Sequence, residues 1–233
     1  SEIQKSELSK IHKICPEKKI EVIPLGFDLE RFNTDKDSKR KEFRKKWNLN
    51  ENEIAIGIIG RLVPIKNHKF FIDAIQEVLK NSKVPIRAFI VGDGEEKQNI
   101  INYIKNKNLD FSLNYNPATF HLTSWIKEID KVNSGMDIIC LTSLNEGTPV
   151  SLIEAQASGK PIVSTKTGGI ENIVLENKTA LLSEKNDLHN FSKNLLSLVN
   201  DSNKRKLFSK LGLEKSKDFH YDQLLNNIKN LYE

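Results

Sequence analysis

A regular alternation between short apolar runs and longer amphipathic segments limits the fold of this chain more than any other feature. The runs are rich in β-branched residues, as in IAIGIIG and IRAFIVG. Continuous runs of this kind are typical of strands buried on both faces, as in parallel sheets. The strands predicted most strongly are residues 54–60, 86–92, 137–143 and 161–165, with weaker strands at 119–122 and 180–182.

The segments between these runs have helical spacing. In the first, apolar side chains recur at intervals of three and four from Phe71 to Leu79, which defines one apolar stripe. Helices are predicted at residues 68–80, 95–107, 125–134, 149–158 and 187–199. Strands that alternate with helices predict an α/β protein with a Rossmann-like, doubly wound parallel sheet.

The two ends of the chain differ from this pattern. Residues 20–25 suggest a short extended segment, and residues 219–232 an amphipathic helix that packs across the sheet or reaches toward a neighbouring domain. Residues 36–47 form a basic helix that carries Phe43 and Trp47. It is either a patch for nucleic acid or anionic lipid, or a solvated helix that packs two aromatic rings on the sheet. We favour the second interpretation because runs of charge usually face water.

Composition excludes several classes of protein. The 36 Lys and Arg exceed the 31 Asp and Glu by five, which allows an anionic partner without naming one. No apolar run approaches the roughly 18 residues of a membrane helix, and the first residues lack the apolar stretch of a signal peptide. Cys15 and Cys140 show no CxxC spacing, so neither a disulfide framework nor a cysteine zinc site is supported. We therefore expect a cytoplasmic protein.

Candidate binding residues follow the predicted strands, because ligands bind at the carboxyl ends of strands in open parallel sheets. After the first strand, GRLVPIKN places Arg61 and Lys66 around a turn that leads into a helix. Two cations beside the free N–H groups of a helix N-terminus suit a diphosphate, although such residues often simply face solvent. After the second strand, Lys97 replaces the third glycine of a GxGxxG fingerprint, which disfavours a dinucleotide site.

The segment after the predicted strand at residues 137–143, TSLNEGTPVSLIEA, is the most informative. We expect Thr148 to cap a helix that Pro149 opens and Gly159 ends. Glu146 then lies ahead of the helix, where it either binds a ligand or offsets the helix dipole. Glu154 lies within the helix among apolar neighbours, and burying an unpaired acid is costly. The two acids are therefore candidates to bind two hydroxyl-bearing parts of one ligand.

These motifs together resemble the donor-binding half of retaining glycosyltransferases of the GT-B fold, family four, also called glycosyl transferases group 1. Glu146 and Glu154 match the Glu(x)7Glu pattern, and Arg61 and Lys66 match the Arg(x)4Lys phosphate motif. IEVIPLGFDLERF is similar to the family's interdomain linker, and FIVGDGEE to its second strand and turn. The resemblance implies a tail of a preceding acceptor domain at residues 1–19, a linker at 20–35 and the donor-binding domain at 36–233.

The resemblance also implies roles for individual residues. Arg61 and Lys66 would hold the nucleotide diphosphate, Glu154 the ribose hydroxyls and Glu146 the donor sugar. Glu146, Arg61 and Lys66 form the implied catalytic set. The implied donor-binding set adds Gly147, Thr148, Pro149, Val150 and Glu154. Thr148 replaces a bulky apolar residue of the family, and residues 114–119 depart from its pattern near the base pocket.

The implied activity is a metal-independent, retaining hexosyl transfer from a nucleotide-diphosphate sugar, with UDP-sugar favoured and no cofactor. The acceptor would be a hydroxyl of a cell-surface glycan or a lipid-linked molecule, and the domain alone would not complete the transfer. The implied partners are the nucleotide sugar, the acceptor domain and an anionic surface at the inner face of the membrane, but not nucleic acid. The Asp-x-Asp at residues 35–37 lies in a lysine-rich polar stretch, so we discount it as a metal site. Two alternatives stay open, a non-catalytic nucleotide-sugar binding module and a nucleotide-sugar epimerase.

Overall fold

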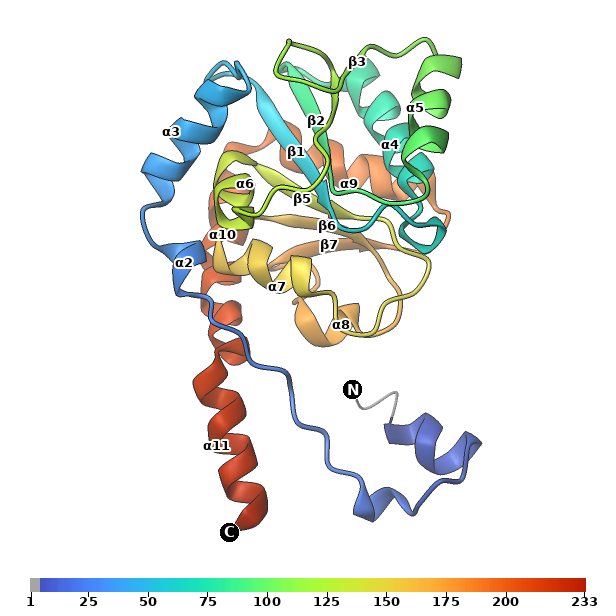
Figure 1. Cartoon of the computed structure of the whole chain (residues 1–233), viewed down its shortest axis with the longest axis vertical. Helices are drawn as coiled ribbons and strands as arrows, with labels where there is room; N and C mark the ends of the chain where they lie inside the picture. Colours follow the sequence, from blue (N-terminus) through green and yellow to red (C-terminus); the bar gives the residue numbers. More distant parts are fainter. Residues whose placement is uncertain (1–4) are drawn as a thin grey trace.

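Seven parallel strands form the centre of the computed structural model, which describes residues 5–233. They are β1 (Ile54–Ile59), β2 (Ile86–Val91), β3 (Phe111–Ser112), β4 (Phe120–Leu122), β5 (Ile138–Leu141), β6 (Ile162–Thr165) and β7 (Ala180–Ser183). Their order across the sheet is β3-β4-β2-β1-β5-β6-β7 (Figure 1). The predicted α/β class and parallel, doubly wound sheet are confirmed. Residues 1–4 of the predicted tail lie outside the described residues.

Helices cover both faces of the sheet. The helices of the sheet domain are α2 (Glu30–Asn33), α3 (Lys36–Lys46), α4 (His68–Asn81), α5 (Lys97–Asn106), α6 (Ile129–Gly135), α7 (Val150–Ala157), α8 (Ile170–Ile173), α9 (Leu188–Asn200) and α10 (Ser202–Ser216), and α11 (Tyr221–Tyr232) follows them at the C-terminus. Single turns lie at η1 (Glu7–Ile11), η2 (Glu17–Lys19), η3 (Pro64–Lys66) and η4 (Lys217–Phe219). One layer is formed by α4, α5 and α9, and the other by α3, α6 and α7 with the short α2 and α8.

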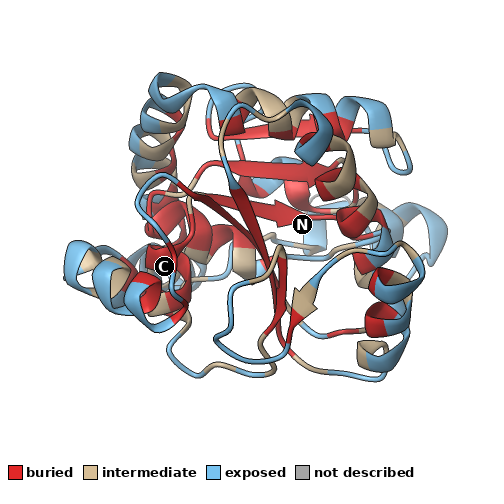
Figure 2. Cartoon of the chain, turned by 90° about the horizontal axis from the view of Figure 1, so that it is seen from above, coloured by how far each residue is buried: buried red, intermediate tan, exposed pale blue. Residues whose placement is uncertain are grey.

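The continuous apolar runs are explained by burial on both faces of the sheet. Ile56 and Ile58 of β1 pack into the first layer, whereas Ala55 and Ile59 pack into the second. The central strands are accordingly drawn as buried along their length in Figure 2. Cys140 of β5 is only 1% exposed, and this burial raises the pKa of its thiol.

The basic helix α3 packs its aromatic residues on the sheet, as the favoured interpretation predicted. Phe43 and Trp47 are buried, with ring centroids 5.6 and 5.4 Å from that of Phe89. Several of its cations pair within the protein, including Lys39, whose Nζ lies 2.9 Å from Asp130 Oδ2. Helix α3 is therefore a structural element of the second layer.

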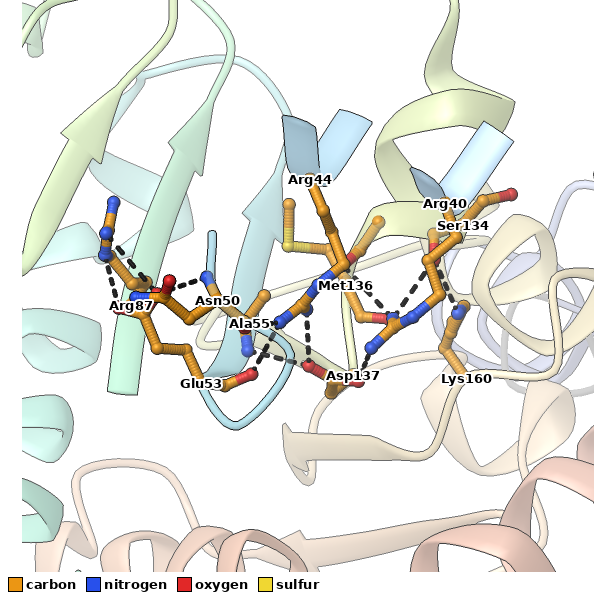
Figure 3. A network of polar contacts seen from close by, with 11 residues as sticks. Arg40, Arg44, Asn50, Glu53, Ala55, Arg87, Ser134, Met136, Asp137 and Lys160 are labelled. Carbon is orange, nitrogen blue, oxygen red and sulfur yellow. Dashed lines mark hydrogen bonds and ion pairs between the residues drawn. The ribbon is translucent and has the colours of Figure 1, made fainter. Parts of the chain in front are cut away.

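A network of charges fixes α3 to the edge of the sheet where the strands begin (Figure 3). Arg44, whose side chain is 2% exposed, donates to the backbone carbonyls of Asn50 and Glu53. Asp137 accepts from Arg40 at 2.8 Å, from Arg44 at 3.3 Å and from the backbone N–H of Ala55 at 2.8 Å. We call this group of charged residues the amino-edge network; its members are Arg40, Arg44, Glu53, Arg87, Asp137 and Lys160.

Besides the single turns, four elements were not predicted, and one predicted helix starts too early. The four are β3, the short helices α2 and α8, and α10, which packs on α7 through Gly212, near Gln156. The helix predicted from residue 125 begins only at Ile129, and Trp125 stays 60% exposed. In α10 the apolar spacing is weak, since Leu207 faces solvent while Phe208 is buried, and this explains the omission.

The extended segment before α2 and the C-terminal helix lie apart from the sheet (Figure 1). The alternative in which α11 packs across the sheet is wrong, because none of its residues is buried. Backbone hydrogen bonds join the two chain segments where they leave the sheet domain. The N–H of Phe27 donates to Phe219, and the N–H of Tyr221 donates to Phe27, at 2.9 and 3.1 Å.

Candidate functional site

The strand order creates a crevice between β1 and β5. The next strand along the chain, β2, pairs with one side of β1, and the later strand β5 pairs with the other side of β1. Ligands bind at such a point, outside the carboxyl ends of the strands. The loops that meet here are residues 60–67 after β1 and residues 142–149 after β5. Both carry the site residues that the sequence predicted.

Lys66 and Glu146 meet across this crevice, although they are 80 residues apart in the sequence. Lys66 Nζ lies 2.5 Å from Glu146 Oε1, and the hydroxyl of Ser143 donates to the same oxygen at 2.5 Å. The side chains of Lys66 and Glu146 are 21% and 11% exposed. The result is a partly buried, charge-assisted pair that remains open to solvent on one side.

The loop after β5 is fixed to the loop after β1. The hydroxyl of Thr142 donates to the backbone carbonyl of Lys66 at 2.9 Å. The N–H of Leu144 donates to the carbonyl of Ile65 at 2.8 Å. These bonds set the distance between the two loops, and therefore bring Lys66 within reach of Glu146.

The loop after β6 supports Glu146 from the other side. The hydroxyl of Thr167 donates to the carbonyl of Leu144 at 2.9 Å, and the N–H of Gly169 donates to the carbonyl of Glu146 at 3.0 Å. Gly168 has φ +54°, and a Cβ there would overlap the carbonyl oxygen of Glu146. The adjacent glycines thus allow a left-handed turn and a close approach between two loops.

Arg61 lies on the exposed part of the loop after β1. Within residues 5–233 its guanidinium makes no hydrogen bond and no ion pair. The same loop leads into α4, whose first residue follows Asn67 without a side-chain cap. The loop after β1 therefore carries an exposed cation and leads into a helix N-terminus with free N–H groups.

The start of α7 differs from the prediction. Pro149, not Thr148, is the N-cap, and no side chain caps the helix, because α7 begins one residue later at Val150. Gly147 and Thr148 are exposed, and a side chain at Gly147 would meet no atom within 4 Å. Both residues border a hollow of about 540 Å³ that residues 22–25 line from the other side.

Glu154 lies apart from the Lys66–Glu146 pair. It is partly buried on α7, and no contact among the described residues joins it to Lys66 or Glu146. Burial raises the pKa of its carboxyl to about 7, Arg31 opposes the rise, and Asp130 adds to it. The two acids of the Glu(x)7Glu pattern are thus separate positions with different electrostatic surroundings.

The polar residues that hold the site together were not among the predicted site residues. These are the buried hydroxyls of Thr142, Ser143 and Thr165 and the side chain of Thr167. His68, the first residue of α4, was not predicted either and is 4% exposed. Burial and the charge of Lys66 lower the pKa of His68 to about 4, so the ring is neutral at pH 7. The available signal was the position of each hydroxyl at the last residue of a strand or within two residues after it.

In residues 5–233, no three His, Cys, Asp or Glu side chains are grouped in a way that suits a metal ion. Asp35 and Asp37 of the Asp-x-Asp stretch lie instead at the start of α3. No helix in the described part of the chain has both the length and the apolar character that crossing a membrane requires.

Comparison with known proteins decides the family. Residues 39–215 match the profile of the family described as glycosyl transferases group 1. The chain belongs to this family. One relative is the Escherichia coli enzyme UDP-Gal:alpha-D-GlcNAc-diphosphoundecaprenol alpha-1,3-galactosyltransferase, 32% identical over 217 residues, covering 92% of this chain and 54% of the relative. This chain spans about half the length of the curated relatives it matches.

Solved structures of other proteins share the fold. Anabaena HepE, crystallised with UDP, has a TM-score of 0.80 and 21% identity, covering 98% of this chain and 61% of that chain. A mutant of TarM from S. aureus, solved with Fondaparinux, alpha-GlcNAc-glycerol and UDP, has a TM-score of 0.68 and 26% identity, covering 78% and 36%. The predicted Rossmann-like half of a GT-B fold is confirmed.

Proposed function

We propose that this chain is the donor-binding domain of a retaining glycosyltransferase and that it binds a nucleotide-diphosphate sugar, preferably a UDP-sugar. The observation that carries the proposal is the meeting of Lys66 and Glu146 in the crevice between β1 and β5, with Arg61 exposed on the same loop as Lys66. This arrangement supplies cations for a diphosphate and a carboxylate for sugar hydroxyls at one point.

Arg61, Lys66 and the N-terminus of α4 bind the diphosphate in this proposal. Donation of the sugar leaves negative charge on the departing diphosphate, and fixed positive groups stabilise that charge in the transition state. Because these groups belong to the protein, the proposed transfer requires no metal ion. Before the ligand arrives, Lys66 is paired with Glu146, and it turns from this carboxylate to the phosphate when the donor binds.

The two acids bind hydroxyl groups in this proposal. Glu146 accepts from the donor sugar, and Glu154 bonds the ribose hydroxyls. The exposed backbone at Gly147 and Thr148 borders the hollow beneath the linker and offers N–H groups to the sugar and phosphate. Pro149 has no N–H to donate and is buried, so it and Val150 shape this rim.

Two relatives support the choice of UDP. The E. coli relative is named for UDP-Gal and for a diphosphoundecaprenol-linked sugar, and the TarM structure contains UDP. We therefore propose a UDP-hexose as donor and a hydroxyl of a lipid-linked or cell-surface glycan as acceptor. We further propose that transfer needs an acceptor domain and takes place in the cytoplasm at the inner face of the membrane.

Calorimetric titration of this chain with UDP, GDP and ADP tests the proposal. We expect UDP to bind most tightly, and Lys66→Ala to weaken its binding by about tenfold or more, as for a lost hydrogen bond to a charged group. Lys210→Ala, which removes an exposed lysine of α10, is the matched control and should leave the affinity unchanged. Binding of none of the three nucleotides would refute the proposal.

A further inference from the structure

The carboxylate of Glu146 is held through one of its two oxygens. Lys66 Nζ and the hydroxyl of Ser143 both lie 2.5 Å from Oε1. Within residues 5–233, Oε2 makes no hydrogen bond. Both oxygens belong to a side chain that is 11% exposed, so Oε2 is the acceptor left for a ligand in the crevice.

Ser143 is itself rigidly placed. Its side chain is fully buried, and it lies just beyond the end of β5. Its carbonyl accepts from the hydroxyl of Thr165 at 2.7 Å, and Thr165 is the buried last residue of β6. The hydroxyl that reaches Glu146 is thus anchored to two neighbouring strands, whereas Lys66 lies on a half-exposed turn.

The other hydroxyls around the site bond to backbone atoms only. Thr142 and Thr165 donate to the carbonyls of Lys66 and Ser143, and Thr167 donates to that of Leu144. Among the described residues, Ser143 alone donates a hydroxyl to the Glu146 side chain. The Ser143 hydroxyl therefore orients the Glu146 carboxylate and does not fix the backbone of the loop.

We propose that Ser143 is the positioning residue of Glu146: its hydroxyl holds Oε1 while Lys66 turns to the diphosphate, and so keeps Oε2 directed at the donor sugar. This inference rests on the proposed function. When Lys66 contacts phosphate, its bond to Glu146 weakens, and Ser143 is then the remaining donor on Oε1. A carboxylate kept in place by a buried hydrogen bond loses less conformational freedom when it binds a sugar hydroxyl.

Ser143 should therefore affect the sugar and not the nucleotide. UDP carries the diphosphate but lacks the group that Glu146 contacts. The ratio of the dissociation constant of UDP to that of the nucleotide sugar measures the contribution of the sugar alone. A general loosening of the site would weaken both ligands and leave this ratio unchanged.

The experiment compares UDP with UDP-galactose, UDP-glucose and UDP-N-acetylglucosamine by calorimetry. In the unaltered chain, at least one sugar should bind more tightly than UDP. In Ser143→Ala, that ratio should fall by about tenfold, as for one hydrogen bond to a charged group, with the affinity for UDP within about twofold. Ser143→Cys, nearly equal in size but a weaker donor, should give an intermediate ratio.

Ser164→Ala is the matched control, because Ser164 is a buried residue of β6 and its hydroxyl donates only to the carbonyl of Thr165. Its ratio should equal that of the unaltered chain. An unchanged ratio in Ser143→Ala, equal weakening of all ligands, or no gain from any sugar in the unaltered chain would overturn the positioning role. Failure of UDP itself to bind the unaltered chain would instead overturn the proposed function.

Discussion

The two edges of the sheet use charge in opposite ways. At the edge where the strands begin, both terminal nitrogens of the buried Arg44 guanidinium have partners, and Asp137 accepts three hydrogen bonds. At the edge where they end, Lys66 and Glu146 form one pair, and Arg61 is exposed. We infer that charges paired within the protein stabilise the fold, whereas exposed charges at the other edge are available to bind a ligand.

Close packing of cations in the amino-edge network destabilises their charged forms. Burial and the charge of Arg40 lower the pKa of both Arg44 and Lys160, the latter to about 7. Asp137 opposes the shift in both residues. A buried group of this kind is stable only while its partners are complete, so removing the shared carboxylate leaves uncompensated charge.

Loss of Asp137 is expected to have the largest effect. Asp137→Ala leaves Arg44 buried without its carboxylate partner and should lower the free energy of unfolding by about 3–5 kcal/mol. Urea denaturation followed by circular dichroism measures this change. Glu42→Ala, which breaks an exposed ion pair with Lys131, is the control and should change stability little. Equal effects of the two variants would contradict the contrast between the edges.

Glu154 gives a pH-dependent effect of intermediate size. Burial raises the pKa of its carboxyl from 4.5 to about 7, so folding favours the protonated form. Its contribution to stability is therefore full below about pH 4.5 and is lost as the pH rises toward 7, a change of up to about 3 kcal/mol.

Glu154→Gln should remove this dependence and make the protein more stable than the unaltered chain at pH 8. The measurement is the free energy of unfolding in urea at a series of pH values. Glu95→Gln, at an exposed position of the loop after β2, should leave the pH profile unchanged. If the two proteins showed the same pH dependence of the free energy of unfolding, burial of Glu154 would not contribute to that dependence.

Gly168 tests the support of the open edge with a smaller effect. Gly168→Ala places a Cβ against the Glu146 carbonyl in a left-handed backbone and should cost about 2 kcal/mol. Gly147→Ala is the matched control for stability, since its Cβ enters open space and its φ is not positive. Thermal unfolding compares them, and equal midpoints for the two variants would mean that the close approach carries no strain.

At the edge where the strands end, the sequence predicted the features that depend on local pattern. Continuous apolar runs predicted β1 and β2, and the rule that ligands bind beyond strand ends selected Arg61, Lys66 and Glu146. That Lys66 lies beside Glu146 depends on β5 pairing with β1, which no local pattern specifies. The supporting bond from Thr165 to Ser143 likewise depends on which strands are neighbours.

Other failures have local causes. Thr148 is a good capping residue, but α7 starts at Val150 and Pro149 takes the N-cap position. In α10 an exposed leucine and a buried glycine weaken the apolar stripe, because the helix packs on α7 at a position that favours a small residue.

Cys140 and Cys15 differ in their access to solvent. Cys140 is enclosed in β5 and its raised pKa keeps it a thiol, while Cys15 is partly exposed in the segment ahead of α2. A maleimide dye added to the native protein should therefore label Cys15 selectively. The unaltered sequence thus provides a single fluorescent reporter on the segment that leaves the sheet domain, without any engineered cysteine.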